Sequence, residues 1–552
     1  EQWLTSVMAE TPAVQTFRRR VHEQRIGKFR ELDERQFAIS RDRIYDRIVS
    51  TFPPRDEIAR ARSERGILLH EMEKRRQIKP LRKLFHEIPD LLLTLKPCLM
   101  MSPLSVAYFL NAEDYHFDMV IFDEASQIFP QDAVGAIFRA DQVIIAGDTK
   151  QLPPTDFFRA GTGGRGDFDT DDEEWEEVCD SILEEAAGVL PGRTLRWHYR
   201  SRHEHLIAFS NQEIYQGQLV TFPGCREQEP DTGVEFCYVE EGVYESGGRN
   251  CNIPEAKRSG QLVREHSENH PDRSLGIIAF SEKQQSAIAL EIRKFREQNP
   301  QYEAFFAEGG EEEFFIKNLE NVQGDERDTI LFSICYARTQ AQKASGRPMS
   351  MRFGPLGMPG GERRLNVAVT RARHNIKVVS SIKPEDIDLT RTDAEGIRML
   401  RSYLAFAMSG GFAAVNGKEA GNADDFADTV AQFLTERGYS VRQSVGCSGY
   451  RLDIAVEHPD DPDEYIAAVE CDGMTYRAAR TARDRDRLRM SALSRMGWNL
   501  YRVWSMEWYR NPDEEGRRLV EFLEEAIRES NERRKAVTDN PPEQNGECDR
   551  NQ

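Results

Sequence analysis

Two neighbouring stretches, VIFDEASQ (Val120–Gln127) and IIAGDTKQLPPT (Ile144–Thr155), decide the expected fold. Each is an apolar run followed at once by polar and acidic residues, which is typical of a buried parallel strand with functional groups at its carboxyl end. After the first run, Asp123 can hold Mg²⁺ through its waters, while Glu124 can polarise a water that attacks a phosphate. The stretches therefore predict an α/β sheet of the kind that carries a nucleotide site.

The second stretch adds groups that can detect the phosphate. Asp148 and Gln151 follow the next strand along the chain, so they are expected to stand beside the same nucleotide. A DE pair after a strand is weak by itself, because a capped loop has the same composition. DEASQ followed one strand later by GDTKQLPP is more specific, and it resembles the Walker B and sensor motifs of superfamily 1 helicases, in the nonsense-mediated-decay and senataxin-like branch. The resemblance implies tandem RecA-like motor domains that use ATP and Mg²⁺.

Two further segments contain the arginines that such a motor needs. LRWHYRSRHEHLIAFSN (Leu195–Asn211) resembles the family segment that sends an arginine, here Arg200, to the γ-phosphate. RRLNVAVTRARHNIKVV (Arg363–Val379) resembles the signature that offers Arg371 as a second arginine finger. Guanidinium groups supplied across a domain cleft stabilise the oxygen charge of phosphoryl transfer. Either arginine alone is better explained by a surface salt bridge, but an ordered series of motifs argues for the catalytic role.

Two more motifs complete the series in the order that the family has them. IIAFSEKQQSAI (Ile277–Ile288) predicts a strand, a turn and a helix, like the first conserved strand of the second motor domain. NVQGDERDTILFS (Asn321–Ser333) resembles the QGxExD-strand motif. This resemblance implies that Gln323, Gly324 and Glu326 contact the nucleotide, together with the sensor residues of the first domain.

The phosphate-cradling loop of such a motor is not in this sequence. That loop ends in Gly-Lys-Ser/Thr and binds the phosphates through its amides and its lysine. The Gly-Lys pairs here, Gly27-Lys28 and Gly417-Lys418, are followed by Phe and Glu. The chain starts at Glu1 rather than Met, so we expect the C-terminal portion of a longer protein or one half of a split one, with the loop on an upstream segment or partner chain. A degenerate ATPase is the alternative, although the intact acids and arginines argue against it.

Composition excludes several classes of protein. No apolar run approaches the roughly 20 residues of a membrane-spanning helix. The nine cysteines show no CxxC pairing, which favours reduced thiols in a cytoplasmic protein over disulfides or zinc. The net charge of −20 argues against nucleic-acid binding at first sight, but acidic residues are concentrated in one loop, DFDTDDEEWEEVCD (Asp167–Asp180). A local basic groove, rather than the net charge, decides such binding.

Helix formers, prolines and glycines divide the chain into domains. Residues 1–94 are expected to be mostly helical, with breaks near Pro80 and Pro89, and the resemblance makes them a stalk-like insertion in the first motor domain. A solvent-exposed pair of helices explains the same pattern. Residues 95–110 are expected to return to the sheet. The expected divisions after the stalk are residues 95–194 for the rest of the first RecA-like domain, 195–401 for the second, 402–424 for a linker, 425–525 for a further domain and 526–552 for a disordered tail.

The region after the linker has a second set of carboxylates. Residues 425–437 predict an amphipathic helix. YRLDIAVEHP predicts a strand with Asp453, and YIAAVECDGMTY predicts a second strand on which alternation puts Glu470 and Asp472 on one face. If the strands pair, they aim three carboxylates at one point. This arrangement suits Mg²⁺, or Mn²⁺ in its place, and a metal-activated water that cuts a phosphodiester.

This order of helix, two acidic strands, arginine-rich helix and strand resembles the PD-(D/E)XK nuclease superfamily, a restriction-endonuclease-like α/β fold. The closest resemblance is to very-short-patch-repair-like endonuclease domains fused to senataxin-like helicases, over residues 424–512. The lysine expected two places after Glu470 is Asp472 here, so a basic group from the next helix, Arg483 or Arg487, would have to replace it. The departure leaves open a catalytically inactive nuclease fold that only binds DNA.

Two functions are consistent with these patterns. The first is an ATP-dependent helicase or translocase coupled to a metal-dependent DNA endonuclease, with DNA as partner and RNA as the alternative. By analogy with fused helicase-nucleases, it would act in defence against foreign DNA or in DNA repair. The second is a nucleotide-gated DNA-binding module with an inactive nuclease fold. The intact Asp453, Glu470 and Asp472 favour the first function, which we expect, and the missing lysine favours the second.

Overall fold

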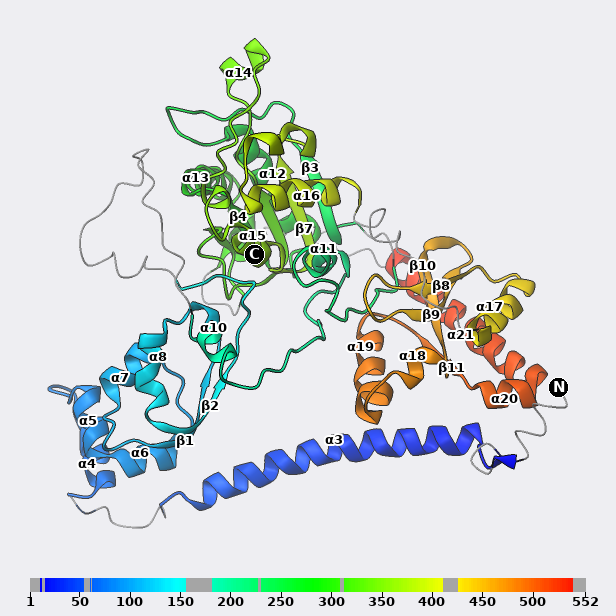
Figure 1. The fold of residues 1–552 in the computed structure, drawn as a ribbon, viewed down its shortest axis with the longest axis horizontal. Helices are drawn as coiled ribbons and strands as arrows, with labels where there is room; N and C mark the ends of the chain where they lie inside the picture. Colours follow the sequence, from blue (N-terminus) through cyan, green and yellow to red (C-terminus); the bar gives the residue numbers. More distant parts are fainter. Residues whose placement is uncertain are drawn as a thin grey trace, which may run out of the picture.

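The computed structural model describes residues 10–11, 15–53, 60, 62–154, 181–226, 230–307, 312–410 and 425–539. Its ribbon has three α/β units, and one long helix runs along the side of the molecule from the last unit to the first (Figure 1). The first unit has a two-stranded sheet, the second a five-stranded sheet and the C-terminal unit a four-stranded sheet. The predicted α/β class is therefore confirmed.

The long helix is α3 (Arg19–Ser50), and most of its side chains are exposed to solvent. Asp33 is the buried residue of this helix. Shorter helices lead from α3 to the first sheet, and they break at Pro80 and Pro89 as the sequence predicts. They are α4 (Glu64–Glu73), α5 (Leu81–Glu87), α6 (Pro89–Leu95) and α7 (Pro103–Phe109).

The expectation that residues 95–110 return to the sheet is wrong, because part of this segment forms α7. Ser102 caps the helix by accepting a hydrogen bond from Ser105 N at 3.2 Å. Pro103 occupies the first helical position, where the missing N–H of proline leaves no hydrogen bond unmade. A cap followed by proline outweighs the apolar character that suggested a strand.

The first sheet consists of β1 (Phe117–Phe122) and β2 (Ala140–Ile145), which pair in parallel. Helices α8 (Pro130–Ile137) and α10 (Ile182–Ala187) cover one face and bury Phe122. On the other face Ile121 is 63% exposed and Ile144 is 46% exposed. The prediction of a buried strand therefore holds for one face alone, although parallel sheets normally have both faces covered.

The second sheet is parallel throughout, in the order β3-β7-β6-β4-β5. Alternate side chains fill two cores: Ile277 and Leu331 lie on one face, while Ile278 and Phe332 lie on the other. The strands are β3 (Gly233–Tyr238), β4 (Leu275–Ala279), β5 (Phe315–Asn318), β6 (Arg327–Ser333) and β7 (Ala372–Ser380). The first face packs against α12 (Ile253–Asn269) and α13 (Glu282–Gln298), and the second against α11 (His205–Glu213), α15 (Gly361–Val369) and α16 (Glu395–Met408).

The C-terminal unit contains the predicted helix, two strands, helix and strand in that order, but a strand that the sequence did not predict, β8 (Val441–Val445), lies between the first helix and the strand of Asp453. Its other strands are β9 (Leu452–His458), β10 (Asp461–Cys471) and β11 (Leu500–Val503). Strand β10 pairs antiparallel with β9 and parallel with β11. Helices α17 (Asp425–Glu436) and α21 (Pro512–Asp539) bury one face of this sheet. Between β10 and α21 lie α18 (Met474–Arg477), the π-helical turn η6 (Asp484–Leu488), α19 (Arg489–Arg495) and α20 (Ser505–Arg510).

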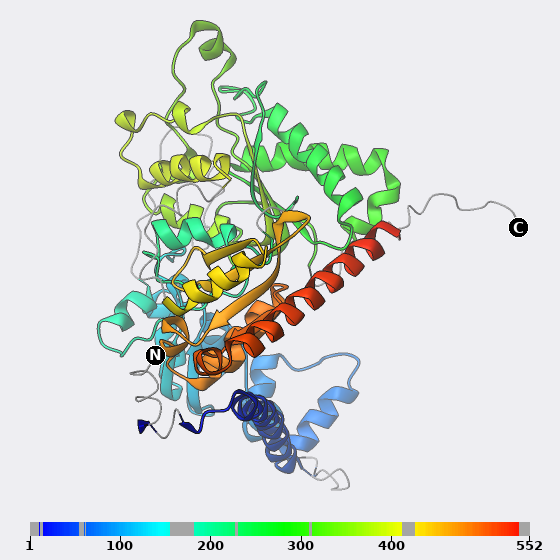
Figure 2. The ribbon, with the colours of Figure 1, turned by 90° about the vertical axis from the view of Figure 1, so that its right-hand side faces the viewer.

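Two predicted boundaries need correction. Helix α16 continues to Met408, past the predicted start of the linker at residue 402, because Tyr403 and Leu404 are buried in the core of the second unit. Helix α21 continues through residues 526–539, which the sequence assigned to a disordered tail, and it crosses the whole C-terminal unit (Figure 2). Arg534 ties this part of α21 to the unit through an ion pair. The acidic loop 167–180 and residues 411–424 lie outside the described residues.

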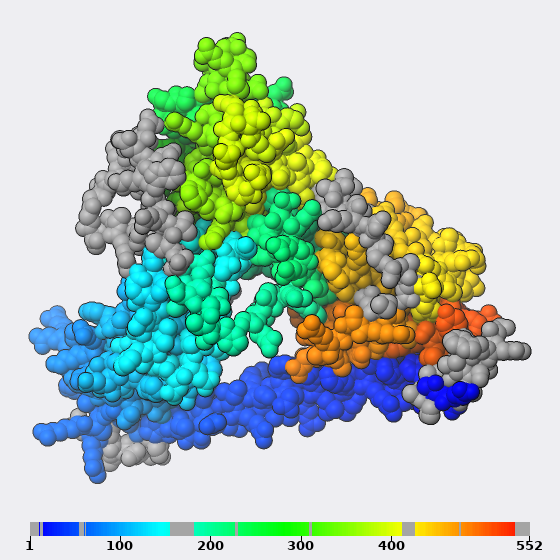
Figure 3. All heavy atoms as spheres, viewed as in Figure 1, coloured from blue at the N-terminus to red at the C-terminus, as the bar shows by residue number. Residues whose placement is uncertain are grey.

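The C-terminal unit is also joined to the rest of the chain by an apolar seam, which residues 195–226 form on the other side. The rings of Phe222 and Tyr450 are 5.1 Å apart, and Nε1 of Trp498 donates to Pro223 O at 2.7 Å. Phe222 is one of the buried residues that form a single core with Tyr450 and Trp498. Figure 3 shows residues 195–226, in teal, lying against the orange C-terminal unit.

Candidate active sites

The acidic ends of β1 and β2 approach closely because a glycine separates them. A Cβ at Gly147 would lie 3.0 Å from Ala125 N and 3.1 Å from Ser126 N, so a larger residue would push the two turns apart. Glu124 has φ of 51°, a left-handed conformation that costs free energy in a non-glycine residue and clusters at functional sites. Asp123 accepts a hydrogen bond from Glu124 N at 3.0 Å. Both acids are thus held at the edge of the first sheet.

Glu124 also contacts the second unit. Nε2 of Gln323 donates to Oε2 of Glu124 at 2.9 Å. Gln323 and Gly324 belong to the turn that leads into β6, where Gly324 has φ of 87°, a conformation that favours glycine. The acid predicted to polarise water and the motif predicted to contact nucleotide therefore meet. We call this place the motor junction and include in it Glu124, Arg200, Gln323, Glu326 and Arg371.

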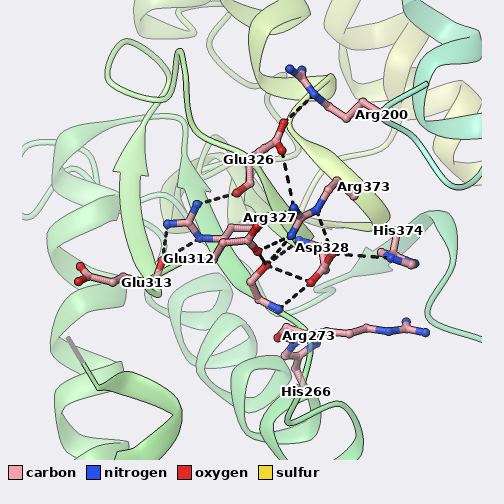
Figure 4. Close-up of polar contacts among 11 residues, drawn as sticks. Arg200, His266, Arg273, Glu312, Glu313, Glu326, Arg327, Asp328, Arg373 and His374 are labelled. Atoms are coloured by element: carbon pink, nitrogen blue, oxygen red, sulfur yellow. Dashed lines mark hydrogen bonds and ion pairs between the residues drawn. The ribbon is translucent and has the colours of Figure 1, made fainter. Parts of the chain in front are cut away.

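A network of charges orients Arg200 at the motor junction (Figure 4). Nε of Arg200 lies 2.7 Å from Oε2 of Glu326, whose other oxygen is 3.6 Å from Nη1 of Arg373. Arg373 pairs with Asp328 at 2.9 Å and with Glu312. Its guanidinium lowers the pKa of Glu312 to about 2. Glu326 therefore neutralises Arg200 and is itself fixed in place by Arg373.

Arg371 lies beside Arg200 and is almost completely buried, with 3% exposure. Its Nε donates to Val367 O at 2.8 Å and its Nη2 to Thr370 Oγ1 at 3.1 Å. Burial, and then repulsion by Arg200, lower the pKa of Arg371 to about 10, so the group stays protonated at neutral pH. Two adjacent guanidinium groups, one of them desolvated, favour a polyanion between them.

Sequence reasoning missed two residues that connect the sensor to the second unit. The hydroxyl of Tyr215 donates to Asp148 at 2.6 Å, and Gln151 donates to the same oxygen at 3.1 Å. Asn366 donates to the Tyr215 hydroxyl at 3.0 Å and to Lys150 O at 2.9 Å. A signal was present in the sequence, because Asn366 is a polar residue within the apolar run LNVAV.

The motor junction fits a nucleotide with its metal ion. Oε1 of Gln151 and Oε1 of Gln323 are buried and have no hydrogen-bond partner among the described residues, so each can accept from a further donor. The described part of the chain holds no cluster of three or more His, Cys, Asp and Glu that would bind a metal by itself. Mg²⁺ at nucleotide sites is bound through one or two carboxylates plus the phosphates. Asp123 is the carboxylate that fits this role.

Glu470 is the centre of a buried polar network in the C-terminal unit. It is 7% exposed and accepts from the Tyr450 hydroxyl at 2.6 Å and from Nη2 of Arg502 at 2.8 Å. Arg502 stands directly opposite on β11, and its Nη1 donates to Asp486 at 2.9 Å. Sequence reasoning missed Arg502, although an arginine in the buried strand YRVW indicates a buried anionic partner.

The other two acids take part in different contacts. Asp453 accepts from Cys471 N at 2.8 Å, and Asp472 accepts from the backbone N and the hydroxyl of Ser505 at 2.9 and 3.1 Å. Among the described residues the three acids form no metal-binding cluster, so their predicted convergence is not seen here. Strand β10 ends at Cys471, one residue before Asp472.

Arg483 and Arg487, the predicted replacements for the missing lysine, both bind the carboxylate of Asp33 in α3. The basic group in contact with Glu470 is Arg502 instead. The catalytic roles assigned to Asp453, Glu470, Asp472, Arg483 and Arg487 stay predictions.

Known protein families match the chain in three parts. Residues 99–157 and 180–383 match two models described as AAA domain, AAA_11 and AAA_12. Residues 426–523 match the model REase_MTES_1575. The chain therefore combines senataxin-like AAA helicase domains with a restriction-endonuclease-like domain, as the motifs predict. The finer assignment to PD-(D/E)XK and very-short-patch-repair-like nucleases stays a prediction.

Curated relatives extend over more of the chain. The uncharacterized ATP-dependent helicase MG140 of Mycoplasma genitalium is 31% identical over 451 residues, which cover 77% of this chain and 38% of that protein. DNA-binding protein SMUBP-2 of Rattus norvegicus is 25% identical over 287 residues, which cover 48% of this chain and 25% of that protein. This chain thus spans less than two fifths of the length of either relative.

Among solved structures, the PRRSV helicase aligns with 50% of this chain and 36% of its own, at 13% identity and a TM-score of 0.23. A likeness of this size has no bearing on function. Within the ranges that the structure describes, none of the helices has the length and apolar character needed to cross a bilayer.

Proposed function

We propose that this chain is part of an ATP-dependent helicase or translocase coupled to a metal-dependent DNA endonuclease. One observation supports the helicase part of this proposal: Glu124, Gln323, Arg200 and Arg371 lie together at the motor junction. There Nε2 of Gln323 is 2.9 Å from Oε2 of Glu124. Relatives named as ATP-dependent helicase and as DNA-binding protein agree with this reading. The nuclease half is supported by the restriction-endonuclease-like match over residues 426–523.

Each residue at the junction has one task in this proposal. ATP with Mg²⁺, when bound, supplies the phosphoanhydride bond to be broken. Asp123 would hold the metal ion, and Glu124 orients and polarises the attacking water. Arg200 leaves Glu326 for the γ-phosphate and, with Arg371, stabilises the oxygen charge that develops there. Because the acids and the arginines belong to different units, the reaction requires that the two units stay closed.

The sensor residues connect this chemistry to movement. Asp148 and Gln151 belong to the first unit, whereas Asn366 belongs to the second, and Tyr215 is hydrogen-bonded to both Asp148 and Asn366. A change at Asp148 on phosphate release therefore reaches α15 through two hydrogen bonds. Such a connection lets hydrolysis alter the angle between the units, which is the step that moves a motor along a strand.

An upstream segment, or a partner chain, supplies the phosphate-cradling loop in this proposal. The open face of the first sheet supports it, since Ile121 and Ile144 expose apolar surface that a parallel sheet normally buries. Adding the segment should restore ATPase activity that nucleic acid stimulates, and the chain alone should turn over negligibly.

A steady-state ATPase assay with and without the segment tests the motor half. In the completed motor, Glu124→Gln should abolish hydrolysis while ATP binding persists. Glu113→Gln, an exposed carboxylate of the same unit, is the matched control and should keep full activity. Rapid hydrolysis by the isolated chain would contradict the need for a second segment.

For the C-terminal unit, the proposal is Mg²⁺- or Mn²⁺-dependent DNA cleavage. Asp453, Glu470 and Asp472 are the carboxylates that would hold the metal ion, which would supply an activated water, and Arg502 provides the basic group beside Glu470. One observation favours the alternative, a nucleotide-gated DNA-binding module with an inactive nuclease fold: each acid already has a protein donor. The cytoplasm as location, and defence or repair as role, belong to the same proposal.

Nicking of supercoiled plasmid by the full chain with its upstream segment distinguishes the two functions. Asp453→Ala should abolish nicking with Mg²⁺ or Mn²⁺ while DNA binding and the circular dichroism spectrum stay unchanged. Salt-sensitive DNA binding without cleavage under either metal would decide for the binding module.

A further inference from the structure

Helix α3 and the C-terminal unit meet at an ionic contact that has an unusual composition. Nε of Arg483 lies 3.1 Å from both carboxylate oxygens of Asp33, and Arg487 binds one of them as well. One turn further along α3, the ring of Phe37 lies 5.4 Å from the Arg483 guanidinium and 5.1 Å from that of Arg487. An anion and an aromatic ring are thus presented together to two arginines.

Ordinary helix packing does not account for this contact. Asp33 is 7% exposed and is the buried residue of α3, whose apolar side chains such as Leu32 and Ile44 face solvent. A carboxylate between guanidinium groups has the charge and oxygen geometry of a phosphate. The ring of Phe37 packs against the arginines as an unpaired base does when it stacks on a guanidinium group, in a single strand or at the end of a duplex. Asp33 and Phe37 therefore offer the arginines the same kinds of group as a nucleic-acid phosphate and base.

We propose that Arg483 and Arg487 form a DNA-backbone-binding surface of the C-terminal unit, and that α3 masks this surface by placing Asp33 where a phosphate binds and Phe37 where a base stacks. The inference rests on the proposed function, in which the C-terminal unit acts on DNA. DNA and α3 are then alternatives for the same arginines.

The masking helix also reaches the candidate carboxylate site. Arg30 of α3 donates to the carbonyl oxygen of Asp486, the residue whose carboxylate binds Arg502. Burial and the nearby Arg502 lower the pKa of Arg30, while Glu470 acts on the same group in the opposite sense. Further towards its start, α3 uses Glu23 to accept a hydrogen bond from Trp504 at 3.1 Å. Release of α3 would therefore uncover both the arginine pair and the approach to Glu470.

DNA-binding measurements on the full chain test the masking. The probe is a short fluorescent DNA duplex, titrated at two salt concentrations and followed by anisotropy. Asp33→Asn and Phe37→Ala weaken the mask, so each should tighten binding by roughly tenfold, the change that 1.4 kcal/mol produces. Asp42→Asn, an exposed acid on the same helix, is the matched control and should bind as the wild type does. Replacing Arg483 and Arg487 together by glutamine should weaken binding in every background and reduce its salt dependence.

Hydrogen exchange of the α3 amides gives an independent readout. DNA should raise exchange over residues 19–40 in the wild type, because it displaces the helix. If Asp33→Asn opens α3 but leaves DNA affinity unchanged, the mask is refuted and the proposed function stands. If no variant binds DNA although α3 opens, the proposed function fails and the surface assignment fails with it.

Discussion

Replacing Arg502 by methionine tests the buried network around Glu470. The side chains of Arg502, Glu470 and Asp486 are 9%, 10% and 3% exposed. Methionine keeps much of the side-chain volume but leaves the buried Glu470 without its cation, while Asp486 keeps its ion pair with Arg485 at 2.7 Å. Removing one partner of a buried ion pair costs about 3–5 kcal/mol, so we expect a loss of about 4 kcal/mol in the free energy of unfolding.

Urea unfolding of the full chain, followed by tryptophan fluorescence, measures this loss. Three of the six tryptophans, Trp498, Trp504 and Trp508, report on the C-terminal unit. With a slope of about 2 kcal/mol per molar urea, the midpoint of this unit should fall by about 2 M. Arg495→Met changes an exposed arginine of α19 and should leave the midpoint unchanged.

A double variant separates charge from packing. Adding Glu470→Gln to Arg502→Met removes the unpaired charge, so much of the lost stability should return. An unchanged midpoint in Arg502→Met would refute the reasoning, because it would mean that Glu470 does not need Arg502 as its counter-ion. Equal loss in the single and double variants would assign the effect to packing.

Two other predictions concern the segment that contains Arg200. In the completed motor, Arg200→Ala and Arg371→Ala should each lower the ATPase rate by roughly 10³-fold, with nucleotide affinity little changed; near-normal rates in both would mean that the arginines do not reach the phosphate. Burial, with a smaller effect of Arg200, lowers the pKa of His198 to about 4, below its unfolded value. The unfolded state therefore takes up the proton first, so the stability contributed by His198 is complete above pH 6.5 and is lost as the pH falls towards 4, by roughly 3 kcal/mol. Urea midpoints of His198→Gln should change less than those of the wild type over this window, whereas the exposed-site variant His70→Gln should follow the wild type.

Local patterns predicted most elements of this fold, because periodicity and capping involve residues that are neighbours in the chain. The apolar run before Asp123 predicted strand β1, and the alternation of side chains around Glu470 predicted strand β10. The family resemblance predicted the order of the three units. The failure at α7 is instructive, since the signals Ser102 and Pro103 were in the sequence and were outweighed by hydrophobicity. The exposure of Ile121 was not predictable, because it depends on which strands stand beside β1.

Contacts between remote residues could not be read from local patterns. Arg502 meets Glu470 only because β11 pairs with β10 in one particular register. Asp33 and Arg483 are 450 positions apart, and their contact depends on where α3 docks. The series of motifs predicted that Glu124, Gln323 and Arg200 serve one nucleotide, and the structure brings Gln323 into hydrogen-bond contact with Glu124.

The apolar seam has a consequence for how this protein can change over evolutionary time. A domain held by a linker alone can be exchanged by recombination, since any folded replacement brings its own finished core. Here Phe222 of the motor completes the core that contains Tyr450 and Trp498. If another domain replaced the C-terminal unit, Phe222 would be left exposed. The C-terminal unit, fused to another protein, would lack the ring that completes its core. We therefore expect the two units to be inherited as one piece, with substitutions on either side of the seam suited to the other side.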